Sequence, residues 1–562
     1  MIRPQKGLTF TLSQVLSQIW YNKVNQIRYG GNTMFKYGRK EQQISMDSPI
    51  MQLPKSLVES LEKSWAASFY AHIFLSVNEG RFSNLYSPIY SRPNRPVNLL
   101  ISLLILKELH GLTDEALMAS LYFDYRFQYA LGISDMESEG LCINTLTNFR
   151  LRLLEHEATQ NEDLFEQEIK ALSEKMALLV GLDKSRARMD SFMVSSACKR
   201  LSRLELVYGV VTNMVETLHK QKATHVTEPF QDFLKEGYRT SLLYHTRSEE
   251  AGTKLDHLLE QASQLYTYVL GLGDYDANPT FEQLTRLLQE QCIETKEGVR
   301  IAIQGKAVKP QSLQNPSDPD ATYRNKGGTG HTGYVANIVE VRDSEKKIGL
   351  ILEFDVKPNT HSDASFGETF VQESPLSAEI NVLAMDGAYY REETVKAAAD
   401  KGLELNFSNM TGRKTKVDQT PVTQFEINDE HIITCCPAAH QPLRSSYDAE
   451  KQIYKATFSK ELCNACPMLA NCPIQQQVKN NTVRFSETKR QSDRVRSKHG
   501  NDRHRELSCF RAGIEGVVSA LRRGYAVDNL PVFGFLRSKL WISSKVAAYN
   551  FKSMFKYQVK RV

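Results

Sequence analysis

The stretch that decides the fold is Val382-Leu383-Ala384-Met385-Asp386-Gly387-Ala388-Tyr389-Tyr390. Its four leading residues are apolar at every position, which predicts a strand that is buried on both of its faces. An aspartate that ends such a strand needs a partner or a function, because a buried, unpaired carboxylate is costly. We therefore expect a mixed α/β fold with a functional carboxylate at Asp386.

Two further acids lie in settings that complement Asp386. Asp190 follows Arg188-Met189 in a short run that predicts a strand from about 187 to 196, and Glu515 lies within a helical pattern from Phe510 to Val518. Two strand carboxylates and one helix carboxylate can hold a pair of divalent ions, and such a pair drives phosphodiester chemistry. The alternative is that each acid is ordinary, since Asp before Gly is often a turn residue and Glu between arginines is often a surface ion pair.

The helical pattern around Glu515 also contains arginines whose spacing places them on the same helix face as Glu515. Arg511 lies four residues before Glu515 and Arg522 seven after it, so a continuous helix would place all three on one stripe. We expect the two arginines to contact phosphates next to a cleaved bond.

Length and composition indicate a multidomain globular protein. The chain has 562 residues, of which 41% are hydrophobic and 24% charged, with a formal net charge of +5. The longest apolar run, from about 97 to 106, is roughly half of what a bilayer span requires, so we expect a buried helix there and no membrane partner. The first twenty residues lack the apolar core of a secretory signal, which favours a cytoplasmic protein.

Five of the nine cysteines fall in one short region. Cys436, Cys463, Cys466 and Cys472 have the spacing Cys-x26-Cys-x2-Cys-x5-Cys, and a Cys-x2-Cys turn lets two thiolates reach one tetrahedral ion. We expect a structural Zn²⁺ that stabilises a polar insertion. Free thiols in a loop remain the alternative, and Cys435 competes with Cys436 for the first ligand position.

Basic residues precede the Glu515 helix and also mark the N-terminal helical block. Arg494 and Arg496 belong to a basic run from Arg484 to Arg505, which predicts sequence-independent DNA contact or else a solvated loop. In the N-terminal block, Arg92, Arg95 and Arg150 are candidate DNA contacts. That block is equally interpretable as a packing or dimerisation domain.

The order of strand aspartate, hairpin, strand aspartate and helix glutamate resembles an RNase H-like nucleic-acid-processing core. On Met189-Asp190-Ser191, Met385-Asp386-Gly387-Ala388-Tyr389 and the Arg511–Glu515 pair, the chain resembles the DDE transposases of bacterial insertion sequences. The resemblance is to the eleven-eighty-two-type group, whose C-terminal part carries a cysteine cluster. Two positions depart from the family pattern: Ser508 stands where a tyrosine is common, and Arg522 where a lysine is common.

The resemblance implies a function. Asp190, Asp386 and Glu515 would be the catalytic residues and the ligands of two Mg²⁺ (or Mn²⁺) ions. The protein would bind double-stranded DNA at transposon ends, cleave it and join the 3′-hydroxyl ends to target DNA, as a homodimer associated with the bacterial nucleoid. Two other hypotheses stay open: a non-catalytic DNA-binding derivative of a transposase, and an RNase H-like nuclease without strand transfer.

These observations predict a fold with five parts. We expect an irregular tail over 1–50 and an all-helical DNA-end-binding domain over 51–180. An RNase H-like catalytic core would comprise 181–197, 326–412 and 504–562. It would be interrupted by a helical insertion over 198–325, of undecided role, and by a cysteine-bearing basic insertion over 413–503.

Overall fold

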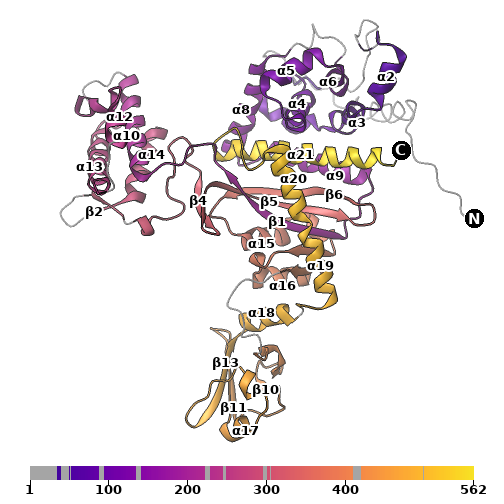
Figure 1. The fold of residues 1–562 in the computed structure, drawn as a ribbon, viewed down its shortest axis with the longest axis vertical. Helices are drawn as coiled ribbons and strands as arrows, with labels where there is room; N and C mark the ends of the chain where they lie inside the picture. The colour runs from indigo at the N-terminus through magenta and orange to yellow at the C-terminus, as the bar shows by residue number, and fades with distance from the viewer. Residues whose placement is uncertain are drawn as a thin grey trace, which may run out of the picture.

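A mixed sheet lies at the centre of the molecule, with helical and cysteine-bearing lobes around it (Figure 1). The computed structural model describes residues 35–38, 50, 52–87, 94–133, 141–221, 228–244, 249–294, 300–303, 305–408, 419–497 and 499–561. The expected irregular tail over 1–50 therefore lies almost wholly outside the described residues. The prediction of a mixed α/β fold is confirmed.

Five strands form the body of the sheet in the order β6-β5-β1-β7-β8. They are β1 (Arg186–Ser195), β5 (Thr329–Asp343), β6 (Ile348–Pro358), β7 (Val382–Met385) and β8 (Glu404–Phe407). β5 runs antiparallel to both β1 and β6, whereas β7 is parallel to β1 and β8 is parallel to β7. A shorter strand, β4 (Thr322–Lys326), pairs with the beginning of β5. All four residues of β7 are buried, as their unbroken apolar sequence predicts.

The N-terminal helices share one continuous hydrophobic core with this sheet. They are α2 (Lys55–Glu62), α3 (Trp65–His72), α4 (Val97–His110), α5 (Asp114–Phe123), α6 (Tyr125–Ala130), α8 (Ile143–Gln160) and α9 (Leu164–Leu179). The expected buried helix is α4, which ends at the left-handed Gly111, and Thr113 caps the next helix by accepting from the Ala116 N–H. The long α21 (Phe535–Val559) packs against α4, α9 and β6, and so joins the helical block to the sheet.

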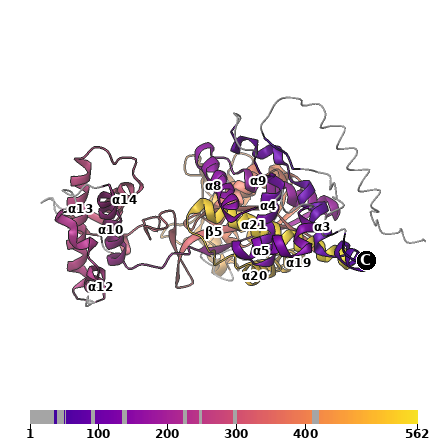
Figure 2. The same ribbon diagram turned by 90° about the horizontal axis from the view of Figure 1, so that it is seen from above.

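Two other lobes have hydrophobic cores of their own. One contains α10 (Arg203–Lys220), α12 (Tyr238–Leu243), α13 (Ala251–Leu270), α14 (Pro279–Gln291) and the small hairpin of β2 (Cys292–Glu294) and β3 (Arg300–Ala302). Figure 2 shows this helical lobe standing apart from the sheet at the end of a connecting stretch. The second lobe, the cysteine module (residues 419–486), lies at the opposite end of the molecule from α4 (Figure 1).

The cysteine module is built on a three-stranded antiparallel sheet. Its strands are β11 (Arg444–Asp448), β12 (Ile453–Ser459) and β13 (Asn480–Ser486), with the small pair β9 (Glu426–Ile427) and β10 (Ile433–Cys435) beside them. A short helix, α17 (Lys460–Asn464), follows β12. The basic α18 (Glu487–Ser497) then leads from β13 back toward the main sheet.

The expected single helix around Glu515 is wrong in one respect. Two helices, α19 (Asp502–Ala512) and α20 (Ile514–Tyr525), meet at Gly513. The helical pattern did not reveal this break, because Gly513 has ordinary helical dihedral angles and only the hydrogen-bond ladder shifts there. α20 ends with its C-cap at Ala526, which adopts the left-handed conformation.

No helix among the described residues combines the length and apolar character needed to cross a membrane.

Candidate active site

The sheet places Asp190 and Asp386 on one row. β1 and β7 are parallel, and their last paired residues are Arg188 and Ala384. The same register continued by two residues sets Asp190 beside Asp386, on the same face of the sheet, and neighbouring strands are about 4.8 Å apart. Two residues that are far apart in the sequence therefore end at adjacent positions.

Glu515 joins this face through Arg511. Glu515 lies in the first turn of α20, and Arg511 lies in the last turn of α19, across the break at Gly513. Arg511 Nη2 lies 3.0 Å from Asp190 Oδ2, and Arg511 Nη1 lies 3.3 Å from Glu515 Oε1. One guanidinium thus bridges the strand carboxylate and the helix carboxylate.

Asp190 has a strongly perturbed environment. Its side chain is 13% exposed, whereas that of Glu515 is 62% exposed. Burial raises the pKa of Asp190 to about 6, and the negative charge of Glu515 adds to this, although Arg511 and Lys326 oppose it. A carboxyl group whose pKa is raised in this way would gain from a divalent cation, which stabilises the ionised form.

A buried ion pair fixes α19 against β1. Arg188 Nε donates to Glu340 Oε2 at 2.5 Å, and Arg188 Nη1 donates to the Phe510 carbonyl at 2.8 Å. Gly513 makes this approach possible, because a Cβ atom there would lie 2.1 Å from Arg188 Nη1. The glycine is required for close packing, and this packing sets the position of Arg511 and Glu515 over the strand.

The opposite face of β1 is fixed by hydrogen bonds of its own. Ser191 Oγ donates to Asp363 Oδ1 at 2.7 Å, which ties β1 to α15 (Asp363–Glu373). Tyr389 Oη donates to Asn337 Oδ1 at 2.7 Å and anchors the loop that follows Asp386. Asp386 itself accepts from the Gly387 N–H at 2.7 Å. These contacts hold both aspartates at fixed positions on the sheet.

The donor set suits Mg²⁺ or Mn²⁺ in kind, since it consists of carboxylate oxygens. In the part of the chain that the structure describes, however, no three Asp, Glu, His or Cys side chains are grouped closely enough to hold an ion. At this site the Arg511 guanidinium lies between the carboxylates of Asp190 and Glu515. The three carboxylates are of the ligand type that these ions prefer, and the Arg511 guanidinium contacts two of them.

Sequence reasoning missed Lys326, whose charge reaches Asp190. Lys326 ends β4 and is followed by Gly327 and Gly328, which take left-handed φ angles of 60° and 82° in the β4–β5 turn. The Lys-Gly-Gly sequence between two strand patterns was the signal that could have identified this basic hairpin tip.

The predicted DNA contacts fall in different settings. Arg494 is exposed on α18, and Arg496 lies on the same helix near the loop after Asp386, where its charge opposes the burial that raises the pKa of Tyr390 to about 12. Arg522 pairs with Asp528 at 3.7 Å and remains half-exposed. Arg95 lies just before α4, half-buried.

Two predicted contacts gain no support from the structure. Arg150 is buried, donates to both carboxylate oxygens of Asp114 and stacks on Trp541, so its guanidinium is committed to packing within the helical block. The local sequence around Arg150 does not indicate this burial, because the partners of Arg150, Asp114 and Trp541, are distant in sequence. Arg92 lies outside the described residues.

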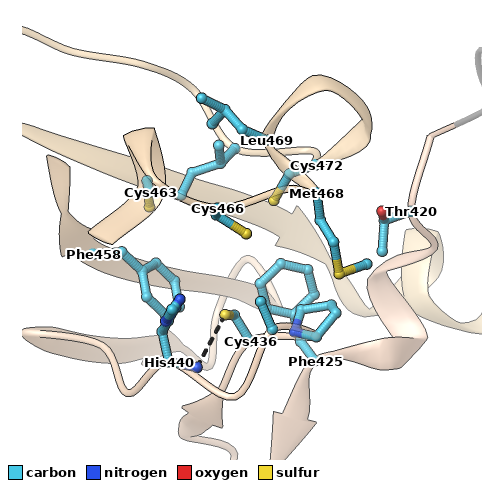
Figure 3. A pocket seen from close by; sticks show the side chains of 13 residues that line it. Thr420, Phe425, Cys436, His440, Phe458, Cys463, Cys466, Met468, Leu469 and Cys472 are labelled. Carbon is cyan, nitrogen blue, oxygen red and sulfur yellow. Dashed lines mark hydrogen bonds between the residues drawn. The ribbon is translucent and has the colours of Figure 1, made fainter. Parts of the chain in front are cut away.

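The four cysteines of the predicted metal site line one small cavity of about 30 Å³. Figure 3 shows the sulfur atoms of Cys436, Cys463, Cys466 and Cys472 around a common space. Burial raises the pKa of Cys472, and the charges of the other three add to the shift. The Cys436 sulfur also accepts from the His440 N–H at 3.4 Å. Cys435 does not line the cavity, so Cys436 is the member of that pair that faces it.

Two transposase family models match the chain. A transposase domain model of the DUF772 family matches residues 59–152, which span α2 to α8. A transposase DDE domain model matches residues 435–555, which include the four cavity cysteines and Glu515, whereas Asp190 and Asp386 lie outside both matches. Comparison with curated proteins and with solved structures gives no match.

The chain thus carries two domains of the transposase class. Both matches support an insertion-sequence DDE transposase.

Proposed function

We propose that this transposase cleaves DNA at the ends of its element and joins the 3′-hydroxyl ends to target DNA, with Asp190, Asp386 and Glu515 as its catalytic residues. The observation that carries the proposal is the shared row of the two aspartates, with the Glu515 helix over the same face of the sheet. The strand order around β1 and the antiparallel β5–β6 hairpin support an RNase H-like core.

Asp190, Asp386 and Glu515 would hold two Mg²⁺ or Mn²⁺ ions. Bound there, the ions supply an activated oxygen nucleophile and stabilise the leaving 3′-oxygen of an in-line displacement. The chain itself fixes the two aspartates on rigid neighbouring strands, and places Glu515 on a helix that is anchored through Arg188. Rigid placement of this kind is what a phosphoryl-transfer site requires of the protein.

Arg511 has two roles in this proposal. In the metal-free protein its guanidinium partly neutralises Asp190 and Glu515, which otherwise repel each other. With divalent ions bound to the two carboxylates, Arg511 would no longer be needed for this neutralisation, and its guanidinium would be free to contact a phosphate beside the cleaved bond. Arg494 and Arg496 on α18 supply further phosphate contacts, since this helix packs near the loop after Asp386.

We also propose that the cysteine module holds a structural Zn²⁺ on Cys436, Cys463, Cys466 and Cys472. The module has a small core of its own, and a tetrahedral ion among four thiolates would stabilise it. The N–H to sulfur hydrogen bond at Cys436 suits a thiolate ligand. Slight closure of the cavity is needed, because the cysteines as they stand are not grouped closely enough for an ion.

Two copies of the chain would act together, each on one element end, in the cytoplasm. The helical block of residues 51–180 is the proposed end-binding domain, a role that its match to a transposase domain supports.

The test compares binding, cutting and joining on the same preparations. Asp190→Ala, Asp386→Ala and Glu515→Ala are each expected to abolish cleavage while end binding is retained, as measured by gel shift and by cleavage of labelled end DNA. Full cleavage by any one variant would remove that residue from the site. Wild-type protein that cuts end DNA but never joins a pre-cut 3′-hydroxyl end to a plasmid would favour the nuclease hypothesis.

A further inference from the structure

A strongly basic groove lies away from the three acids, between the β5–β6 turn and the C-terminal turns of α21. It has a volume of about 550 Å³. Six cationic side chains line it, with Glu345 as the one acid among the described lining residues: Arg342, Lys346, Lys347, Lys556, Lys560 and Arg561. Tyr549, Ser553 and Tyr557 also line the groove.

Most of this positive charge has no internal partner. In the described parts of the chain, no ion pair joins Lys347, Lys556 or Lys560 to an acid, and all three are exposed. Lys346 is the exception, since it pairs with Asp343 at 3.5 Å. The groove therefore presents a concentrated field that counter-ions or an anionic partner must balance.

The backbone conformation of Lys347 is unfavourable for a lysine. Lys347 takes a left-handed φ of 57°, a conformation that glycine or asparagine adopts at lower cost. Lys552, Lys556 and Lys560 follow one another at intervals of four residues in or just after α21, and like charges at that spacing destabilise a helix. The helix dipole favours Lys556 in the last turn of α21. Lys347 has no such local explanation, whereas an anionic ligand in the groove would account for it.

We propose that this basic groove binds the phosphate backbone of target DNA. The inference rests on the proposed function, which supplies DNA as the substrate. Four of the six cations are exposed, and no Asn or Gln lines the described part of the groove. Exposed cations of this kind suit contacts to phosphates, which need no fixed base sequence. Target DNA, unlike an element end, has to be held without reading a fixed sequence.

The groove is placed to hold DNA that also reaches the acids. Ile338 on β5 is the cross-strand partner of Asp190, and Arg342 lies four residues further along the same strand. That separation is about 13 Å at the rise of a β-strand, which is less than one turn of a DNA duplex. One DNA duplex is therefore long enough to contact the basic groove and the three acids at the same time.

The experiment uses the full chain and a 30-base-pair duplex of random sequence, with binding followed by fluorescence anisotropy in EDTA over a salt series. The triple variant Lys347→Gly, Lys556→Ala and Lys560→Ala is expected to bind at least tenfold more weakly at low salt. The slope of log affinity against log salt should fall by about 2 to 3, since each lost phosphate contact removes roughly 0.9. Lys347→Gly alone should keep or raise the melting temperature.

The matched control removes Lys220, Lys235 and Lys254, which pair with neighbouring acids elsewhere on the surface. This control variant should show the same slope of log affinity against log salt as the wild type. Equal binding by the triple variant and the wild type would overturn the proposal. So would a triple variant that loses end cleavage but joins pre-cut ends normally, because the groove would then serve end DNA. Failure of the catalytic proposal is distinguishable, since it concerns cutting by Asp190→Ala and leaves binding in EDTA untouched.

Discussion

At the scale of single residues, Asp190 links the site to the stability of the fold. Its carboxyl group is largely buried and its pKa is raised to about 6 from an ordinary value of 3.8. At pH values between 3.8 and about 6, Asp190 keeps its proton in the folded chain and releases it in the unfolded chain. The free energy of unfolding therefore falls as pH rises through that window, by up to about 3 kcal/mol from this residue.

Asp190→Asn should remove this dependence. In EDTA, the stability of the variant relative to the wild type should increase by as much as about 3 kcal/mol between pH 4 and pH 7, as measured by urea unfolding. A difference that stays flat over this range would show that Asp190 is not buried as the structure has it. The variant also loses the ion pair between Arg511 and Asp190. This loss lowers the unfolding free energy of the variant by a similar amount at every pH, so it does not produce the expected change with pH.

At the scale of elements, the junction of α19 and α20 positions Arg511 and Glu515 in the candidate active site. Gly513→Ala would force a Cβ atom against the Arg188 guanidinium, which is held by Glu340 and by the Phe510 carbonyl. We expect a loss of about 1 to 3 kcal/mol in unfolding free energy and a large fall in cleavage, because Arg511 and Glu515 move with the helices.

Gly516→Ala is the matched control for this variant. It lies within α20, three residues after Gly513, and a Cβ atom there meets nothing within 4 Å. Alanine should stabilise α20 at that position by up to about 1 kcal/mol. Chemical denaturation of both variants tests the pair, and equal stabilities would contradict the packing role of Gly513.

The same elements show what the sequence could predict. The apolar run before Asp386 and the apolar run from about 97 to 106 are local signals, and the buried strand and buried helix that they predict are confirmed. The pairing of Asp190 with Asp386 depends on a register between segments almost two hundred residues apart, which no local pattern contains. The stacking of Arg150 likewise depends on a distant tryptophan, and the close packing at Gly513 depends on the Arg188 guanidinium of β1.

At the scale of the whole molecule, the separate core of the cysteine module predicts separate unfolding. If Zn²⁺ holds the module, about one ion per chain should co-purify, as measured by elemental analysis. Cys463→Ser with Cys466→Ser should lose that ion and open the module, while the core shared by the sheet and the N-terminal helices stays folded. Hydrogen exchange restricted to residues 419–486 would report this. Cys142→Ser with Cys509→Ser, at exposed positions, should keep the metal.

The central claim is that Asp190, Asp386 and Glu515 together bind divalent cations on one face of the sheet. The most direct measurement is the anomalous-scattering map of a crystal of the full chain bound to end DNA and Mn²⁺, under conditions that block cleavage. The account predicts manganese peaks within coordination distance of all three carboxylates, with Arg511 turned away from Asp190. Manganese absent from this face, or bound without Asp386 or Glu515, would contradict it.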